Sequence, residues 1–419
     1  MTMNPIATNG EAPSKIWQPL QIGRLQLAHR VVMSPLTRAR SPAGLPTALS
    51  SEYYCQRVTQ GGLIISEGIH PSLMGGNYHG VPSMYSPEHI RAWKKITDAV
   101  HARGGYMFCQ IWHTGRVAVS ACLGGRQPLG PSSVKLDWTQ LFTPVGRVPC
   151  EEPREMTMED IKDTIADHVH SAKCAIEAGF DGVEIQGANG YLLEQFLSPG
   201  VNNSRKDAYG GSPIENRARL TLEILDAVTS AIRADRVGIR LSPYNYFQIP
   251  ESHPDPVTDF TWLLKKIDGF GLAYVTVMQP RTEMMGSAAA RLASTYEIAR
   301  ARGVPEDQLE YVVSIRPFRK ALKKTPMLSS GGFDATNWVE PLERGDLDGV
   351  VFGRQFISNP DLVERLRNGW DLAPWNMKTF YTPGPEGYVD YPVWSTNAAD
   401  ACEKDDDETT GNKLQSLKL

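Results

Sequence analysis

Short apolar runs alternate with stretches of helical period along most of this chain, and no other feature restricts the fold as strongly. The runs are apolar on both faces, as parallel strands covered by helices are. They occupy residues 30–35, 63–67, 106–111, 182–186, 237–241, 273–278, 327–330 and 349–352. Eight such strands, each followed by helical sequence, close most simply into an α/β structure, the (β/α)8 TIM barrel.

Helix ends support this reading. Ser86 and Pro87 offer an N-cap and a first-turn proline for a helix that runs to Ala102. Thr157 caps another helix, and Gly179 stands where that helix should end. A doubly wound open sheet is the alternative, but no Gly-x-Gly-x-x-Gly turn follows the first strand.

Two segments interrupt the alternation of strands and helices. Residues 124–155 are rich in Pro and Gly and are predicted to form a capping excursion over one barrel mouth, and residues 281–305 form an insertion after strand six. We expect a flexible N-terminal arm at 1–15, a single barrel domain at 16–395 and an acidic, disordered tail at 396–419.

Composition excludes several classes of function. The 419 residues carry a net charge of -4, which gives no electrostatic footprint for nucleic acid, and no apolar run is long enough to span a bilayer. The first residues lack the order of a signal peptide, so a cytoplasmic location is expected. The six cysteines form no Cys-x-x-Cys pair, so they are expected to be reduced thiols, and no metal site is predicted.

The end of the fourth strand carries the most informative side chains. Gln186 and Asn189 are amide donors, and Tyr191 is a phenol that follows them directly. Donors beside a weak acid suit a site that polarises a carbonyl and protonates a carbon. The alternative is a capped strand–helix junction with a buried tyrosine.

The ends of the other strands suggest a bound phosphate and a flat ring. Gly332, Gly353 and Arg354 follow the last two strands, where barrels often bind phosphate, although such glycines also serve in tight turns. Polar side chains close the first, third and fifth strands and suit a heteroaromatic with carbonyl edges. Four aromatic side chains are predicted to wall an apolar substrate slot: Tyr78, Trp112, Phe247 and Tyr381.

Taken together, the motifs resemble the old yellow enzyme family of FMN-dependent ene-reductases, also described as NADPH dehydrogenases. The resemblance covers residues 20–392. It rests on Pro35-Leu36-Thr37-Arg38, Gln110-Ile111-Trp112, Ala188-Asn189-Gly190-Tyr191-Leu192-Leu193, Tyr209-Gly210-Gly211-Ser212-Pro213, Arg240-Leu241-Ser242-Pro243-Tyr244, Gly353-Arg354-Gln355-Phe356 and Gly387-Tyr388-Val389-Asp390-Tyr391-Pro392.

The resemblance implies non-covalent FMN and a hydride from NADPH or NADH. It assigns flavin contacts to Pro35, Thr37, Gly68, Gln110 and Arg240, and phosphate contacts to Gly332, Gly353 and Arg354. Hydride would reach the β-carbon of an α,β-unsaturated carbonyl compound, and Tyr191 would donate a proton to the α-carbon. Gln186 and Asn189 would hold the carbonyl oxygen. A monomer or homodimer with a small-molecule substrate is expected, in a fungal secondary-metabolite pathway.

Position 186 departs from the family pattern. Relatives commonly carry His where this chain has Gln186, and an amide donates a hydrogen bond but carries no proton or positive charge. The alternative to an ene-reductase is therefore a flavin-dependent double-bond isomerase or another tailoring enzyme. Two further classes stay open: a flavin-free barrel enzyme with Glu67 as its nearest candidate carboxylate, and a flavin-binding protein without catalysis.

Overall fold

Eight parallel strands form a closed barrel in the computed structural model, which describes residues 14–76, 79–137, 140–143, 146–249, 253–282 and 287–395. Around the barrel each strand pairs with the next in the sequence, and the last pairs with the first. The barrel strands are β3 (Val31–Met33), β4 (Leu63–Ile69), β5 (Tyr106–Ile111), β10 (Gly182–Gly187), β11 (Val237–Leu241), β12 (Tyr274–Met278), β13 (Met327–Ser330) and β14 (Gly349–Phe352). The predicted TIM barrel is confirmed.

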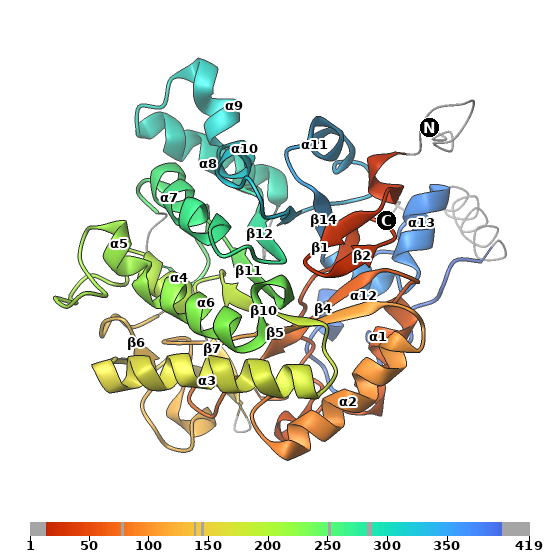
Figure 1. Ribbon diagram of the computed structural model, residues 1–419, viewed down its shortest axis with the longest axis horizontal. Helices are drawn as coiled ribbons and strands as arrows, with labels where there is room; N and C mark the ends of the chain where they lie inside the picture. Colours follow the sequence, from red (N-terminus) through yellow and green to blue (C-terminus); the bar gives the residue numbers. More distant parts are fainter. Residues whose placement is uncertain are drawn as a thin grey trace, which may run out of the picture.

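Helices surround the strands in Figure 1. They are α1 (Ala48–Arg57), α2 (Pro87–His101), α3 (Met158–Glu177), α4 (Leu192–Leu197), α5 (Ile214–Arg217), α6 (Arg219–Ile232), α7 (Pro256–Asp268), α8 (Ala288–Ala301), α9 (Leu309–Val312), α10 (Arg316–Ala321), α11 (Val339–Arg344), α12 (Arg354–Ser358) and α13 (Leu362–Asn368).

The predicted helix ends agree with the structure. Ser86 Oγ accepts a hydrogen bond from the His89 amide, and Thr157 Oγ1 accepts one from the Asp160 amide, so both residues cap their helices. Gly179 adopts φ +90° directly after α3, where a left-handed residue closes the helix.

The alternation of side chains along each strand decides what reaches the barrel interior. In β10, Val183 and Ile185 belong to the main apolar core with residues of α3 and α6, whereas the carboxylate of Glu184 contacts side chains of β5 and β12 inside the barrel. Gln186 is two positions further along the strand, so its side chain also faces the barrel interior. The last inward residue of β10 therefore stands at the carboxyl end of the barrel, where such enzymes carry their sites.

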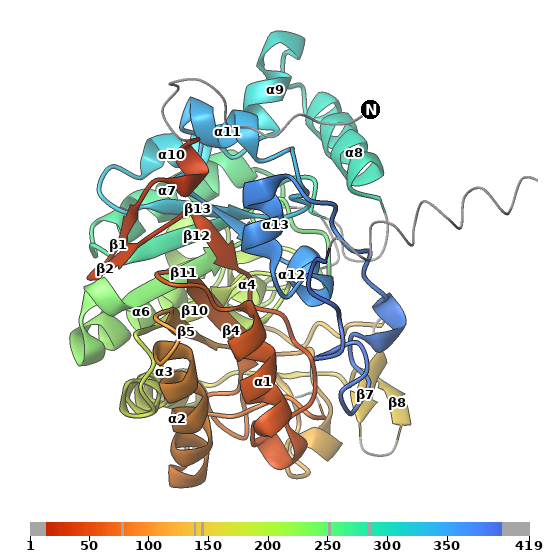
Figure 2. The same ribbon diagram turned by 90° about the vertical axis from the view of Figure 1, so that its right-hand side faces the viewer.

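The two ends of the barrel are closed differently. A hairpin of β1 (Leu20–Ile22) and β2 (Leu25–Leu27), which the sequence analysis did not predict, packs its leucines against the lower interior of the barrel. Four short strands in the predicted capping excursion pair two by two: β6 (Leu129–Gly130) with β9 (Arg154–Glu155), and β7 (Gln140–Thr143) with β8 (Gly146–Pro149). Figure 2 shows β1 and β2 at one end and β7 and β8 at the other.

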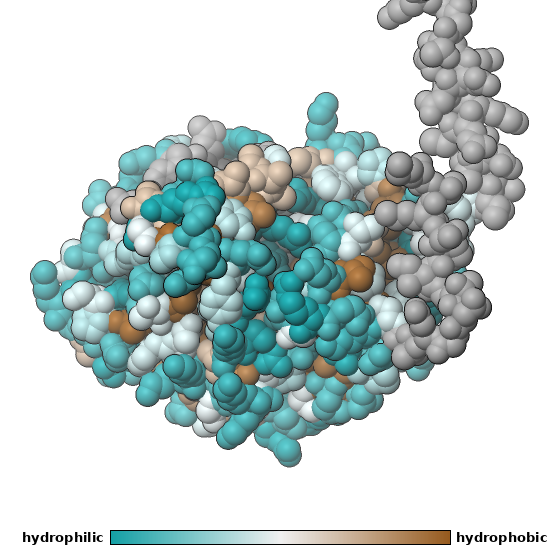
Figure 3. Space-filling model, turned by 90° about the horizontal axis from the view of Figure 1, so that it is seen from above, coloured by the Kyte–Doolittle hydropathy of each residue, from teal (hydrophilic) through white to brown (hydrophobic). Residues whose placement is uncertain are grey.

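The predicted insertion after strand six contains α8, which lies with α9 at the edge of the barrel in Figure 1. Most of the predicted arm and all of the tail lie outside the described residues, although Lys15 begins a 3-10 helix (Lys15–Trp17). Among the described helices, none combines the length and the apolar character that a bilayer crossing requires. The face in Figure 3 is mainly hydrophilic, with small scattered apolar spots.

Candidate active site

A layer of buried polar side chains lies inside the barrel below the mouth. Gln110 of β5 donates from Nε2 to Glu184 Oε1 at 2.7 Å, and Thr276 Oγ1 donates to Glu184 Oε2 at 3.2 Å. Burial raises the pKa of Glu184. Burial lowers the pKa of Arg240, and the nearby Glu184 carboxylate counteracts part of that shift. Glu184 therefore holds Gln110 by a hydrogen bond and favours the charged form of Arg240, and the resemblance assigns both residues to the flavin.

Arg240 offers donors that the protein does not fully use. Its Nη1 donates to Ser34 Oγ at 3.2 Å, whereas its Nε is buried without a hydrogen-bond partner. A buried guanidinium N–H without a partner is costly unless another acceptor meets it. A flat ring with carbonyl and ring-nitrogen acceptors across the mouth would supply one, so these donors fit the expected flavin.

Pro35, Thr37 and Gly68 stand on neighbouring strand ends. Pro35 and Thr37 are half-buried in the loop after β3, and Gly68 lies in β4 beside a bulge. A Cβ at position 68 would come within 2.5 Å of Trp112 Cε3, so the indole requires glycine there. The absence of a side chain lets Trp112 lie flat against the strand at the mouth.

The ends of β13 and β14 form the predicted phosphate cradle. Gly332 adopts φ +66°, and a Cβ there would meet nothing closer than 3.6 Å. Gly353 precedes the first turn of α12, and the Arg354 guanidinium lies 5.0 Å from the centroid of the Trp375 ring. The sequence analysis missed a second cation, Arg281, whose Nε donates to the Gly331 carbonyl at 3.1 Å. Open glycines at two neighbouring strand ends, with Arg281 beside Gly332 and Arg354 following Gly353, fit a phosphate.

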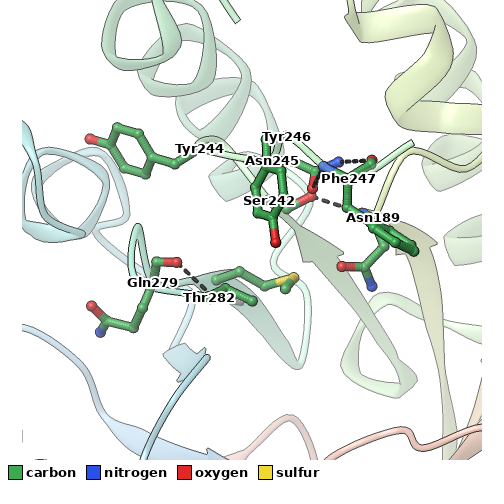
Figure 4. Close-up of a pocket in the computed structure, with 9 residues that line it drawn as sticks. Asn189, Ser242, Tyr244, Asn245, Tyr246, Phe247, Gln279 and Thr282 are labelled. Atoms are coloured by element: carbon green, nitrogen blue, oxygen red, sulfur yellow. Dashed lines mark hydrogen bonds between the residues drawn. The ribbon is translucent and has the colours of Figure 1, made fainter. Parts of the chain in front are cut away.

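The turn that follows β10 places the predicted catalytic side chains. Asn189 adopts φ +63°, and its backbone amide donates to Ser242 Oγ at 2.9 Å. Gly190 also has a positive φ, and a Cβ there would come within 2.5 Å of the Phe247 carbonyl oxygen. In Figure 4 the Asn189 side chain extends beside the Phe247 ring, away from the hydrogen bonds that Ser242 and Asn245 make. The backbone of this turn is tightly held while the amide side chain is left to face the pocket.

Tyr191 lies between two residues that fix its ring and its oxygen. Trp112 meets it edge to face, with ring centroids 4.7 Å apart, and Gln248 Nε2 donates to Tyr191 Oη at 3.3 Å. Tyr191 also packs against an apolar cluster that includes Leu136 and Leu141 of the capping excursion. The excursion therefore shields the phenol that the resemblance assigns as proton donor.

Gln186 reaches the same mouth from the barrel interior. It is 6% exposed, and its Oε1 atom is buried without a hydrogen-bond partner. Its Cα partner in the next strand is Arg240. The side chain thus lies at the level of the proposed flavin contacts and keeps an unused acceptor.

The predicted substrate wall is only partly assembled. Phe247 lines a pocket with Asn189, whereas Tyr381 is 60% exposed, and Tyr78 lies outside the described residues. The sequence analysis missed four polar side chains that line this pocket, namely Asn245, Tyr246, Gln279 and Thr282. Their position after β11 and β12 was the available signal.

Glu67, the candidate carboxylate of a flavin-free enzyme, does not line that pocket. Its Oε2 accepts a hydrogen bond from the Arg38 amide at 3.2 Å, and its own amide donates to Tyr54 Oη at 3.0 Å. Burial raises the pKa of Glu67 to about 7. The side chain holds the loop after β3. Within the described ranges, no group of three or more His, Cys, Asp or Glu side chains is placed to hold a metal ion.

Comparison with known proteins settles the family. Residues 15–372 match the model of the NADH:flavin oxidoreductase / NADH oxidase family. The chain belongs to this family. Flavin oxidoreductase hxnT of Emericella nidulans is 42% identical over 392 residues, which cover 90% of this chain and 97% of that protein. The 12-oxophytodienoate reductase 7 of Oryza sativa subsp. japonica is 40% identical over 387 residues, covering 90% and 94%.

Solved structures of morphinone reductase agree. One is 34% identical with a TM-score of 0.81 and covers 92% of this chain and 98% of that one. A second is of a variant in complex with tetrahydroNAD, and it is 35% identical with a TM-score of 0.80, covering 92% and 99%. The protein is thus a member of the old yellow enzyme family, an oxidoreductase with FMN as its cofactor.

Proposed function

We propose that this old yellow enzyme reduces the activated C=C bond of an α,β-unsaturated carbonyl compound with hydride from NADPH or NADH. Bound FMN supplies the hydride-transfer chemistry. The observation that carries the proposal is the placement of Tyr191 in the turn that carries Asn189: its ring packs edge to face on Trp112, and Gln248 Nε2 donates to its Oη at 3.3 Å, which orients the phenol. Two relatives are named as reductases of 12-oxophytodienoate and of morphinone, and both names denote ketones.

The other side chains have complementary roles in the proposal. Asn189 and Gln186 present amide N–H groups that hold the carbonyl oxygen and stabilise the negative charge that develops there. Arg240, with its unpaired Nε, and Gln110 hold the polar edge of the flavin beside Thr37 and Pro35, while Gly68 admits the Trp112 ring against the strand. Gly332, Gly353 and Arg354 hold the phosphate.

Phe247 and Tyr381 wall the substrate, with Trp112 behind Tyr191. The assignment of Tyr78 to the same wall stays a prediction. A secondary-metabolite pathway, a cytoplasmic location and a monomeric or homodimeric state also stay predictions.

An anaerobic two-step experiment tests the proposal. NADPH should bleach the flavin absorbance of the purified protein, and 2-cyclohexenone should then restore it with formation of one cyclohexanone per flavin. A double bond that moves without consumption of NADPH would instead support the isomerase alternative. Flavin that no activated alkene reoxidises would contradict the ene-reductase proposal, and a protein that also moves no double bond would contradict both.

A further inference from the structure

A buried carboxyl group behind the catalytic turn has no role in the functions assigned above. Glu194 lies in the first turn of α4, and its side chain is only 4% exposed. Three donors converge on its Oε2 atom: the Gly190 amide at 2.6 Å, Ser242 Oγ at 2.9 Å and Asn245 Nδ2 at 3.0 Å. These partners are all uncharged, so Glu194 acts here as a hydrogen-bond acceptor and not as half of an ion pair.

Two of the three hydrogen bonds lead to the turn that carries Asn189. The Gly190 backbone amide donates to the carboxyl group directly. Asn189 is linked to it through Ser242, whose Oγ accepts a hydrogen bond from the Asn189 backbone amide and donates one to Glu194. Asn189 and Gly190 have φ angles of +63° and +74°. A non-glycine residue pays for this left-handed conformation, so surrounding contacts must hold it.

The third hydrogen bond leads to the substrate wall. Asn245 Nδ2 also donates to the Phe247 carbonyl at 2.9 Å, and Asn245 Oδ1 accepts from the Phe247 amide at 2.9 Å. Figure 4 shows Asn245, Ser242, Phe247 and Asn189 as one connected group. One carboxyl oxygen thus joins the turn after β10 to the loop after β11.

We propose that Glu194 is a positioning residue: through its acceptor oxygen it fixes the positions of the Asn189 side-chain amide and of the Phe247 ring. The inference rests on the proposed function, in which both side chains face the substrate. Burial raises the pKa of Glu194 to about 8, so the group is mainly protonated at neutral pH and its carbonyl oxygen remains the acceptor.

A pair of variants separates an acceptor from mere packing. Glu194→Gln keeps the size and the acceptor oxygen, whereas Glu194→Leu removes the oxygen that all three donors share and leaves the buried Gly190 amide without an acceptor. Glu223→Leu is the matched control. Glu223 lies on α6, and its carboxylate accepts a hydrogen bond from Tyr209 Oη, so this variant also removes an acceptor. Each FMN-loaded protein is assayed with NADPH and 2-cyclohexenone and by amide hydrogen exchange of the peptide that covers residues 187–193.

We expect Glu194→Leu to speed exchange in this peptide about tenfold and to lower kcat about 10- to 100-fold, since a misplacement near 1 Å has effects of this order. Glu194→Gln and Glu223→Leu should stay within about threefold of the wild type in both readouts. Glu194→Leu with wild-type exchange and kcat would overturn the inference. Equal losses in the Gln and Leu variants would overturn the acceptor role.

Hydrogen exchange keeps this test separate from the proposed function. A wild-type protein that reduces no enone would defeat the ene-reductase proposal, while exchange in the two variants would still decide whether Glu194 holds the turn. If Glu194→Leu does not fold, Ser242→Ala tests the inference instead, because it removes only the hydroxyl that links the Asn189 backbone amide to Glu194. Unchanged exchange and turnover in Ser242→Ala would overturn the inference.

Discussion

At the scale of single residues, position 186 has the largest chemical consequence. An imidazole can carry a proton near neutral pH, whereas the Gln186 amide donates a hydrogen bond of constant charge. The structure places this amide in the barrel mouth with its Oε1 unpaired. Carbonyl binding at this site should therefore depend little on pH through this residue.

Replacing the amide by an ionisable ring tests this point. In Gln186→His, protonation at acidic pH would turn the donor into a cation, so KM for 2-cyclohexenone should fall about threefold to tenfold between pH 8 and pH 5.5. The wild type should lack this trend, as should the exposed control Gln127→His. Matching pH profiles of KM in Gln186→His and the wild type would show that position 186 does not contact the carbonyl oxygen.

Tyr191 allows a sharper test, because one atom carries its proposed role. Tyr191→Phe keeps the edge-to-face contact with Trp112 and removes only the hydroxyl. Loss of a general acid costs typically about 10²–10⁴ in rate, so alkene reduction should slow within that range while flavin reduction by NADPH stays within about twofold. Stopped-flow measurement of the two half-reactions separates them. Tyr209→Phe, which also removes one hydroxyl, should change neither rate.

At the scale of elements, the segment after α13 is fastened to the loop after β3 by arginine–carbonyl hydrogen bonds. Arg40 donates to the carbonyl oxygens of Phe380, Gly384 and Glu386, and Arg38 donates to those of Phe380 and Gly387. The segment carries Tyr381, and the loop carries Thr37. Fastening them together therefore couples one proposed substrate contact to one proposed flavin contact.

Removing one of these guanidiniums should loosen the whole segment. Arg40→Met leaves several carbonyl oxygens near Tyr381 without their donor, and we expect it to lower the free energy of unfolding by about 2–4 kcal/mol. Arg91→Met, at an exposed pair with Glu88, should cost at most about 0.5 kcal/mol. Urea unfolding of the two variants measures both values. Equal stability of the variants would mean that the C-terminal segment is held by its apolar contacts instead.

The elements also show how far the sequence alone could be followed. Strands β5, β11, β13 and β14 have the predicted ends, because apolar runs bounded by turn residues are a strong local signal. The β1–β2 hairpin escaped prediction, since each strand has three residues and only Leu20, Ile22, Leu25 and Leu27 alternate. Such a short pattern is not distinguishable from a loop before its packing partners inside the barrel are known.

In the candidate site too, local motifs could be recognised from the sequence, whereas contacts between distant residues could not. Asn189 and Tyr191 stand in one short motif and could be recognised locally. Glu194 directly follows this motif, but its role depends on Ser242 and Asn245, which are 48 and 51 positions away. Gln248 is likewise 57 positions from Tyr191. Contacts that only barrel closure creates could not be predicted from the spacing of residues.

At the scale of the whole molecule, burial of ionisable groups sets how stability depends on pH. The pKa values of Glu67 and Glu194 are raised by burial to about 7 and about 8, from an ordinary 4.5. The native state holds protons there that the unfolded chain has released. Their contribution to stability is therefore fully present below pH 4.5 and declines as the pH rises through 8.

Buried histidines act in the opposite direction. Burial lowers the pKa of five of them to about 3 or 4, from an ordinary 6.5, and these are His29, His70, His113, His168 and His253. Because the unfolded chain takes up protons that the native state refuses, stability is present above pH 6.5 and is lost as the pH falls toward 4. Below pH 6.5 the effect of the five histidines on stability exceeds that of the two carboxyl groups, so stability falls as the pH falls.

The two opposed sets place the maximum of stability near about pH 7, with a decline on both sides. Thermal unfolding of the FMN-saturated protein between pH 4.5 and pH 9, at constant ionic strength, measures this profile. Glu194→Gln should flatten the alkaline side and steepen the rise between pH 4.5 and the maximum, because its amide does not ionise. A Tm that keeps rising from pH 7 to pH 9 would show that Glu67 and Glu194 ionise in the native protein at their ordinary pKa, and so that water reaches both carboxyl groups.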